Sequence, residues 1–82
     1  MANQIAFVNG DGWQGIYIND RLVLQDDRIP PQDVMRIMLY KVFDDEQLFY
    51  PDMDWLDEQG EYPNDLNDVL LENGKTVRET RG

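Results

Sequence analysis

The chain has 82 residues and a formal net charge of −10, with 17 Asp and Glu against seven Lys and Arg. A chain of this length forms one domain with a small core, because it buries only ~60–65% of its unfolded surface. It contains no cysteine and no histidine, which excludes disulfides and thiolate metal sites and removes the commonest general base.

The first 25 residues predict three antiparallel strands. Residues 3–8 alternate as a strand, residues 9–12 form an Asn-Gly-Asp-Gly turn cluster, and residues 13–18 are aromatic and β-branched. Asn19-Asp20 fits a two-residue hairpin turn before a third strand over 21–25. A β-meander is the simplest connection between these strands.

The two-residue turn also predicts a strand register, with Tyr17 opposite Leu22 and Ile16 opposite Val23. One face of the hairpin would then carry Trp13, Tyr17, Leu22 and Leu24, and the other would carry Ile16, Ile18 and Val23. Both faces are partly apolar, so we expect later segments to wrap the second face rather than leave it to a partner.

A helix is predicted over residues 31–43, since the prolines at 30 and 31 suit a first helical turn. One wide apolar stripe holds Val34, Met35, Met38, Leu39, Val42 and Phe43, with Asp33, Arg36 and Tyr40 opposite. We expect this helix to pack on the sheet, with both methionines as core filler.

Residues 44–50 allow two interpretations, a fourth short strand or an extended linker. Asp52 is a good N-cap for a short helix through Gln59, with Gly60 as its stop. A second short helix is predicted from residues 63–65 to Asn73, stopped by Gly74. We expect five residues of these pieces to face inward: Met53, Leu56, Leu66, Val69 and Leu70.

The sequence therefore predicts an α+β fold. It consists of a three-stranded antiparallel β-meander, with a fourth short strand left open, packed by one main helix and followed by two short C-terminal helices. Residues 1–74 would form a single domain, and residues 75–82 would form a polar, flexible tail.

Two stretches resemble segments of small uncharacterised bacterial and bacteriophage proteins. The first is Trp13-x-Gly15-Ile16-Tyr17 followed by Leu22-Val23, and the second is Asp54-Trp55-Leu56-x-x-x-Gly60-x-x-Pro63-x-x-Leu66-x-x-Val69. Together they cover under half of the chain. The resemblance implies no activity, cofactor or partner, but it favours an origin in a phage or mobile element.

The acidic residues are concentrated in one segment. Residues 1–43 carry a net charge of −1 and residues 75–82 carry +2, whereas residues 44–74 hold eleven acids and no Lys or Arg. Such a segment repels nucleic acid and attracts basic surfaces. The candidate partner-binding residues are Asp44, Asp45, Glu46, Asp52, Asp54, Asp57, Glu58, Glu61, Asp65, Asp68 and Glu72, with Tyr50, Trp55 and Tyr62 as aromatic anchors.

No pattern of a catalytic, cofactor or metal site fits. The Asn-Gly-Asp-Gly cluster leads into a strand and lacks the Lys and Ser or Thr of a P-loop. Counted from Asp52, positions six and twelve of an EF-hand loop would be Asp57 and Pro63, where Gly and Glu are needed. Serine is absent as well as histidine, so no Ser-His triad can form. We therefore expect a protein that is not an enzyme.

The leading hypothesis is a non-catalytic interaction protein, phage-encoded, that inhibits a nucleic-acid-binding or host-defence protein by filling its basic groove as a nucleic-acid mimic. An alternative is an oligomer that binds or sequesters a small ligand such as a nucleotide, with Trp13 and Tyr17 beside Arg21 and Arg28. A structural accessory subunit is a third interpretation. Without a visible signal peptide or membrane span, we expect a cytoplasmic location, in the host if phage-encoded.

Overall fold

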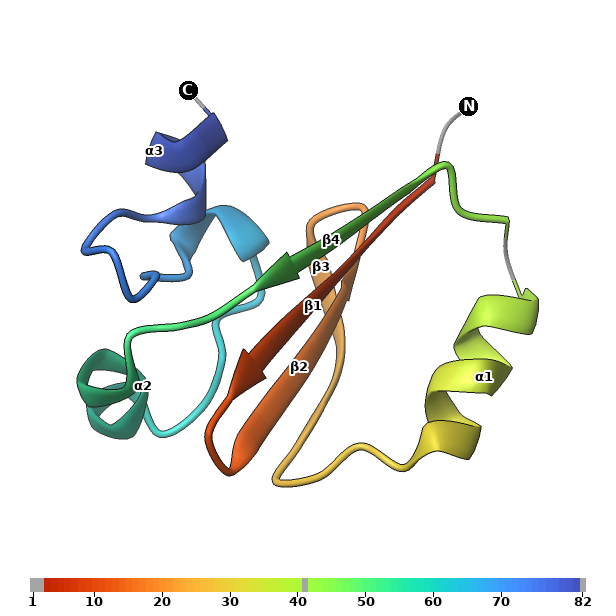
Figure 1. Cartoon of the computed structure of the whole chain (residues 1–82), viewed down its shortest axis with the longest axis horizontal. Helices are drawn as coiled ribbons and strands as arrows, with labels where there is room; N and C mark the ends of the chain where they lie inside the picture. The colour runs from red at the N-terminus through yellow and green to blue at the C-terminus, as the bar shows by residue number, and fades with distance from the viewer. Residues whose placement is uncertain (1–2, 41, 82) are drawn as a thin grey trace.

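The computed structural model describes residues 3–40 and 42–81, and its four strands form one mixed sheet in the order β3-β2-β1-β4 (Figure 1). The strands β1 (Gln4–Gly10), β2 (Trp13–Ile18) and β3 (Arg21–Asp26) form the predicted antiparallel meander. β4 (Asp45–Phe49) lies parallel to β1 at the edge of the sheet. The α+β class is confirmed, and the segment left open supplies a fourth strand.

The β2–β3 hairpin has the predicted turn but a different register beyond it. Asn19 and Asp20 both have positive φ, 50° and 70°, as a type I′ turn requires. Tyr17 pairs with Leu22 as predicted, but Ile16 pairs with Leu24. The predicted Ile16–Val23 pair is wrong because Val23 is the extra residue of a β-bulge. Leu24 therefore lies on the face of Ile16, not on that of Tyr17.

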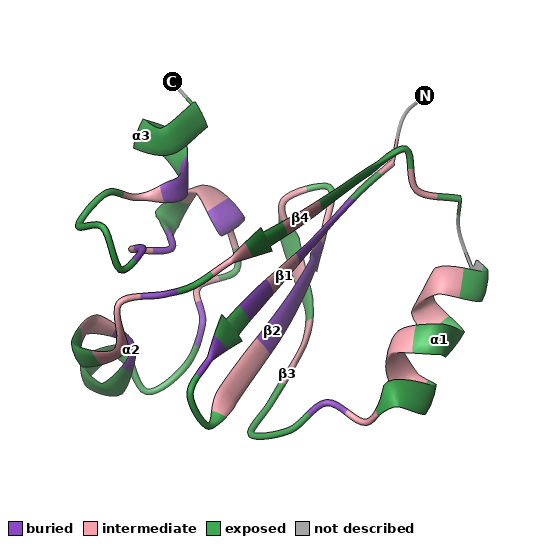
Figure 2. Ribbon diagram, viewed as in Figure 1, coloured by how far each residue is buried: buried purple, intermediate pink, exposed green. Residues whose placement is uncertain are grey.

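Each face of the sheet has its own apolar cluster, and later parts of the chain contact both, as expected. Figure 2 shows the C-terminal half on one side of the sheet and the main helix on the other. On one face, the C-terminal half packs against β1 and β2 through Ala6, Val8, Tyr17, Leu56, Tyr62, Leu66, Val69, Leu71 and Val77. On the other, the main helix packs against Ile5, Ile16 and Ile29.

The main helix, α1, spans Pro31–Tyr40 and is shorter than predicted; residue 41 of the predicted helix lies outside the described residues. The inward residues of α1 are Val34, Ile37 and Met38. The predicted stripe is wrong for three members, because Met35, Leu39 and Val42 are exposed. At 100° per residue Met35 and Leu39 lie to one side of a face that is centred on 34, 37 and 38, and Val42 lies past the end of α1.

The short helix α2 (Met53–Gln59) has the predicted ends. The Asp52 side chain accepts a hydrogen bond from Trp55 N, and Gly60 adopts a left-handed conformation with φ 78°. Both features satisfy backbone groups that a helix end leaves free. Among the described residues, no helix has the length and apolar character needed to cross a membrane.

The predicted second short helix ends after a single 3-10 turn, η1 (Leu66–Asp68). The following residues are drawn into isolated bridges, Pro51 with Leu71 and Leu70 with Thr76. These pairings replace the predicted helix to residue 73, and Leu71 rather than Leu70 is buried.

The C-terminal residues continue the packed domain, although the sequence placed residues 75–82 in a tail. A last helix, α3, spans Val77–Arg81, and the Val77 side chain is fully buried. Val77 N donates a hydrogen bond to Val69 O at 3.0 Å. The described residues after Gly74 thus contribute to the core.

Candidate functional site

The helix α2 presents three carboxylates on one side. Asp54, Asp57 and Glu58 are exposed, and their i, i+3 and i+4 spacing makes them neighbours on a helical surface. Leu56 lies opposite them and is buried in the core, which fixes the direction in which the carboxylates point. Glu61 is also exposed, just past the end of the helix.

The three predicted aromatic anchors differ in their surroundings. Tyr50 is 47% exposed, whereas Trp55 is partly buried against the core cluster. Tyr62 is only 2% exposed, so its assignment as a partner-binding anchor is wrong. Its hydroxyl donates to Trp13 O at 2.6 Å, and burial raises the pKa of Tyr62 to about 12. Its role is to hold the C-terminal half on β2.

Four of the predicted acids have side-chain contacts within the chain, and one of them, Asp45, accepts a hydrogen bond from Gln47 Nε2 at 2.9 Å. Asp52 caps α2, and the Asp65 side chain accepts from Asn67 N at 2.9 Å as the cap of η1. Arg78 lies 3.3 Å from Asp68 and 4.0 Å from Asp65. The basic C-terminal residues therefore fold back onto the end of the acidic segment and offset its charge there.

A separate acidic group stands at the start of β4. Asp44, Asp45 and Glu46 are all exposed, and Asp44 N donates to Asn3 O at 2.9 Å. This group and α2 lie at opposite ends of β4 (Figure 1), a strand that spans ~13 Å at the usual rise per residue. The predicted acidic surface over residues 44–72 is thus divided by the fold into separate groups.

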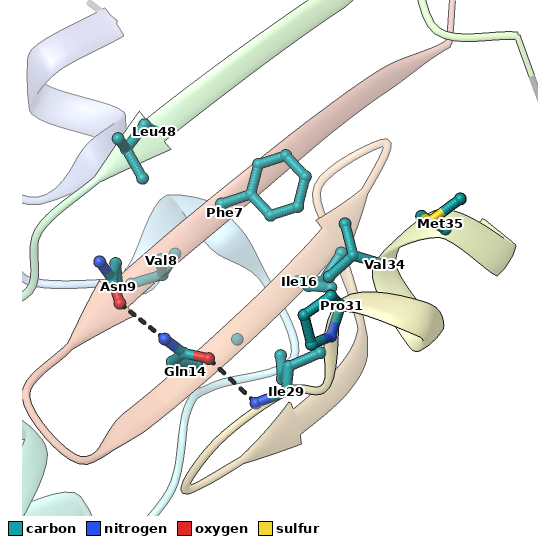
Figure 3. A pocket seen from close by; sticks show the side chains of 11 residues that line it. Phe7, Val8, Asn9, Gln14, Ile16, Ile29, Pro31, Val34, Met35 and Leu48 are labelled. Carbon is teal, nitrogen blue, oxygen red and sulfur yellow. Dashed lines mark hydrogen bonds between the residues drawn. The ribbon is translucent and has the colours of Figure 1, made fainter. Parts of the chain in front are cut away.

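A groove of about 510 Å³ lies between α1 and the sheet, and its apolar lining includes Phe7, Ile16, Val34, Met35 and Leu48 (Figure 3). Its two polar side chains are already engaged. Asn9 accepts a hydrogen bond from Gln14, and Gln14 accepts one from Ile29 N, both at 3.0 Å. The groove therefore suits apolar groups.

Sequence reasoning missed this groove. The available signal was Leu48, an apolar residue that follows the polar run from Asp44 to Gln47. It could be interpreted only once residues 45–49 were known to form an edge strand beside Phe7.

The four residues named for the small-ligand alternative differ in their surroundings. Tyr17 is fully buried, and its hydroxyl donates to Pro63 O at 2.6 Å. Burial, followed by the charges of Tyr62, Asp65 and Asp68, raises the pKa of Tyr17. Trp13 Nε1 donates to Gln25 Oε1 at 3.1 Å. Arg21 and Arg28 are exposed. Tyr17 thus acts as a core residue here.

Comparison with protein-family models, with curated proteins and with solved structures found no match to this chain. Within residues 3–40 and 42–81, no group of three or more acidic side chains is arranged to hold a metal ion.

Proposed function

We propose that this chain is a non-catalytic acidic protein that inhibits a nucleic-acid-handling protein by occupying its basic groove. The observation that supports the proposal is the exposed row of Asp54, Asp57 and Glu58 on α2. The ion pairs among the described residues all involve Arg78 or Arg81. The carboxylates of α2 are therefore available to cations of a partner.

The charge spacing on α2 is comparable to that of a nucleic-acid strand. Asp54 and Glu58 are four residues apart, which is ~6 Å along a helix axis. With Asp57 ~4.5 Å from Asp54 along the axis, three charges lie within ~6 Å, a density comparable to the one charge per ~3.4 Å along a DNA strand. A groove lined by Arg and Lys to bind phosphates can thus pair with these three carboxylates through charge density.

The mechanism is competition for the groove. The net charge of −10 speeds encounter with a basic partner, so the association rate falls as salt rises. Tyr50, exposed just before α2, supplies an aromatic contact of the kind that interfaces favour. A phage origin, proposed from the sequence resemblance, makes a host nucleic-acid-binding or defence protein the target.

The test compares capture of proteins from nuclease-treated bacterial lysate by immobilised wild-type chain and two matched variants. D54N/D57N/E58Q neutralises the row on α2, and D44N/D45N/E46Q neutralises the other acidic group. Each changes the net charge from −10 to −7. We expect the wild type to retain nucleic-acid-binding proteins that duplex DNA displaces, and we expect the α2 variant alone to lose them.

Two results would contradict the proposal. Equal loss with both variants would mean that total charge, not α2, attracts the captured proteins. Retention by the α2 variant at physiological salt would mean that the partner binds elsewhere. Circular dichroism of both variants confirms that the fold is intact, since all six side chains are exposed.

A further inference from the structure

The face of the sheet that packs on α1 is only half covered. Four strands ~4.8 Å apart span ~14 Å between the outer pair, whereas one helix is about 10 Å across. α1 approaches the β2–β3 half, where Ile37 and Arg36 lie beside Ile18 and Leu24. Ile5 at the start of β1 is buried in the cluster beneath α1, so the groove lies over the later part of β1 and over β4, at Phe7 and Leu48. Parallel strand pairs such as β1–β4 normally have both faces covered.

The uncovered half presents apolar side chains from two elements. Leu48 of β4 is 55% exposed and Met35 of α1 is 62% exposed, and both line the groove. Leu48 pairs in register with Phe7 on the groove floor. Figure 3 shows Phe7, Val34 and Leu48 around the same space. Contiguous apolar surface of this kind on a small domain marks an interaction site.

Charge at one end of the groove identifies the kind of partner. Asp44 and Glu46 are exposed where β4 begins, and Glu46 and Leu48 are two residues apart, on the same face of the strand. Asp45 lies on the other face, where it accepts a hydrogen bond from Gln47 Nε2 at 2.9 Å. None of the ion pairs in the described part of the chain uses these acids. A second copy of this chain would bring another charge of −10 and is disfavoured by repulsion.

We infer that the groove between α1 and β4 binds an amphipathic helix of a cationic protein. The helix lies over β1 and β4 as the second helix of the layer, with its apolar face on Phe7, Met35 and Leu48. Its Lys or Arg residues meet Glu46 and the neighbouring Asp44. This is a second site, separate from the carboxylates of α2 on the other side of the sheet, so the two proposals can fail independently.

The test uses three synthetic peptides, each of about five helical turns, and fluorescence anisotropy. The first is an amphipathic helix of Leu and Lys, the second has the same composition in scrambled order, and the third has Glu in place of Lys. The protein variants are M35Q/L48T in the groove, V23T on exposed β3 as a matched apolar-to-polar control, and the two triple acid variants described above.

We expect the amphipathic Leu/Lys peptide to bind the wild type at least ten-fold more tightly than either other peptide. M35Q/L48T and D44N/D45N/E46Q should each weaken it at least ten-fold, while V23T and D54N/D57N/E58Q change it less than two-fold. Equal binding of the scrambled peptide, or full binding by M35Q/L48T, would overturn the inference. So would a wild-type dimer in sedimentation that M35Q/L48T abolishes, because the occupant would then be a second copy.

Discussion

Gly15 of β2 lies directly against the ring of Tyr62, and an alanine there tests how the two halves of the chain are joined. A Cβ at position 15 would stand 2.8 Å from Tyr62 Cδ2 and 3.0 Å from Cε2. Carbon atoms in favourable contact are ~3.5–4.0 Å apart, so the ring would have to retreat by about 0.7 Å.

The ring has little freedom to retreat. Its hydroxyl is held by Trp13 O at 2.6 Å, and Tyr62 N donates to Gln25 Oε1 at 2.9 Å. Overpacking of a fixed core costs about 1–3 kcal/mol. Alanine is more favourable than glycine within a strand by about 0.5–1 kcal/mol, which offsets part of this cost. We therefore expect Gly15→Ala to lower the free energy of unfolding by about 1 kcal/mol or more.

Urea denaturation followed by tryptophan fluorescence measures this change, as a midpoint shift of about 1 M for a small domain. A double-mutant cycle with Tyr62→Leu assigns it to the ring, since leucine lacks Cε2 and the rigid ring and can turn away from position 15. Gly15→Ala should then cost less in the Tyr62→Leu background than in the wild type. A neutral Gly15→Ala, or strictly additive costs, would refute the close packing of Tyr62 on this glycine.

Three further changes probe the C-terminal half. Removal of residues 75–82 deletes the buried Val77 side chain and should lower the stability by at least ~1.5–3 kcal/mol in thermal melts, the worth of one buried aliphatic side chain. Asp52→Ala removes the N-cap of α2 and should cost about 1 kcal/mol in urea denaturation, while Asp52→Asn should cost much less. Tyr62 has its pKa raised from 10.0 to about 12 by burial, so its neutral form stabilises the fold fully below pH 10. That contribution should be lost as the pH rises from about 10 through about 12. The Tyr62→Phe variant should lose less stability over this range. The loss of stability that remains comes from Tyr17, whose pKa is also raised.

Each of these expectations has a clear contrary result. A truncated chain as stable as the wild type would mean that Val77 is not part of the core in solution. Equal stability of the Asp52→Ala and Asp52→Asn variants would mean that the cap hydrogen bond to Trp55 N is not formed. A stability that is flat between about pH 10 and pH 12 would place the Tyr62 hydroxyl in water.

The features predicted correctly from the sequence are those set by neighbouring residues. The Asn19-Asp20 turn depends on two residues that tolerate positive φ. The ends of α2 depend on the Asp52 side chain and on Gly60, each within a few residues of the backbone groups it satisfies. Such signals need no knowledge of the rest of the fold.

The features that were missed depend on distant contacts. The bulge at Val23 is visible only when β3 is paired with β2. The helix predicted to residue 73 is replaced by bridges that join Leu70 and Leu71 to Thr76 and Pro51. Tyr62 is an aromatic residue among acids in the sequence, but its ring packs on Gly15 from the opposite half of the chain.

The candidate site shows the same limit, because a run of charge in sequence becomes a surface only through the fold. At 0.15 M salt, exposed charges more than ~8 Å apart are largely screened from each other. β4 alone, Asp45–Phe49, separates its first acids from α2 by ~13 Å. The two acidic groups therefore act as independent local surfaces at physiological salt. Their sum governs long-range attraction of a partner only at low ionic strength.

Neutralising either acidic group should therefore change the association with a partner equally at about 0.01 M salt, where the screening length is ~30 Å. At about 0.15 M salt the two neutralisations should change it by different amounts. Equal effects of the two neutralisations at both salt concentrations would instead show that the two groups contact one continuous partner surface.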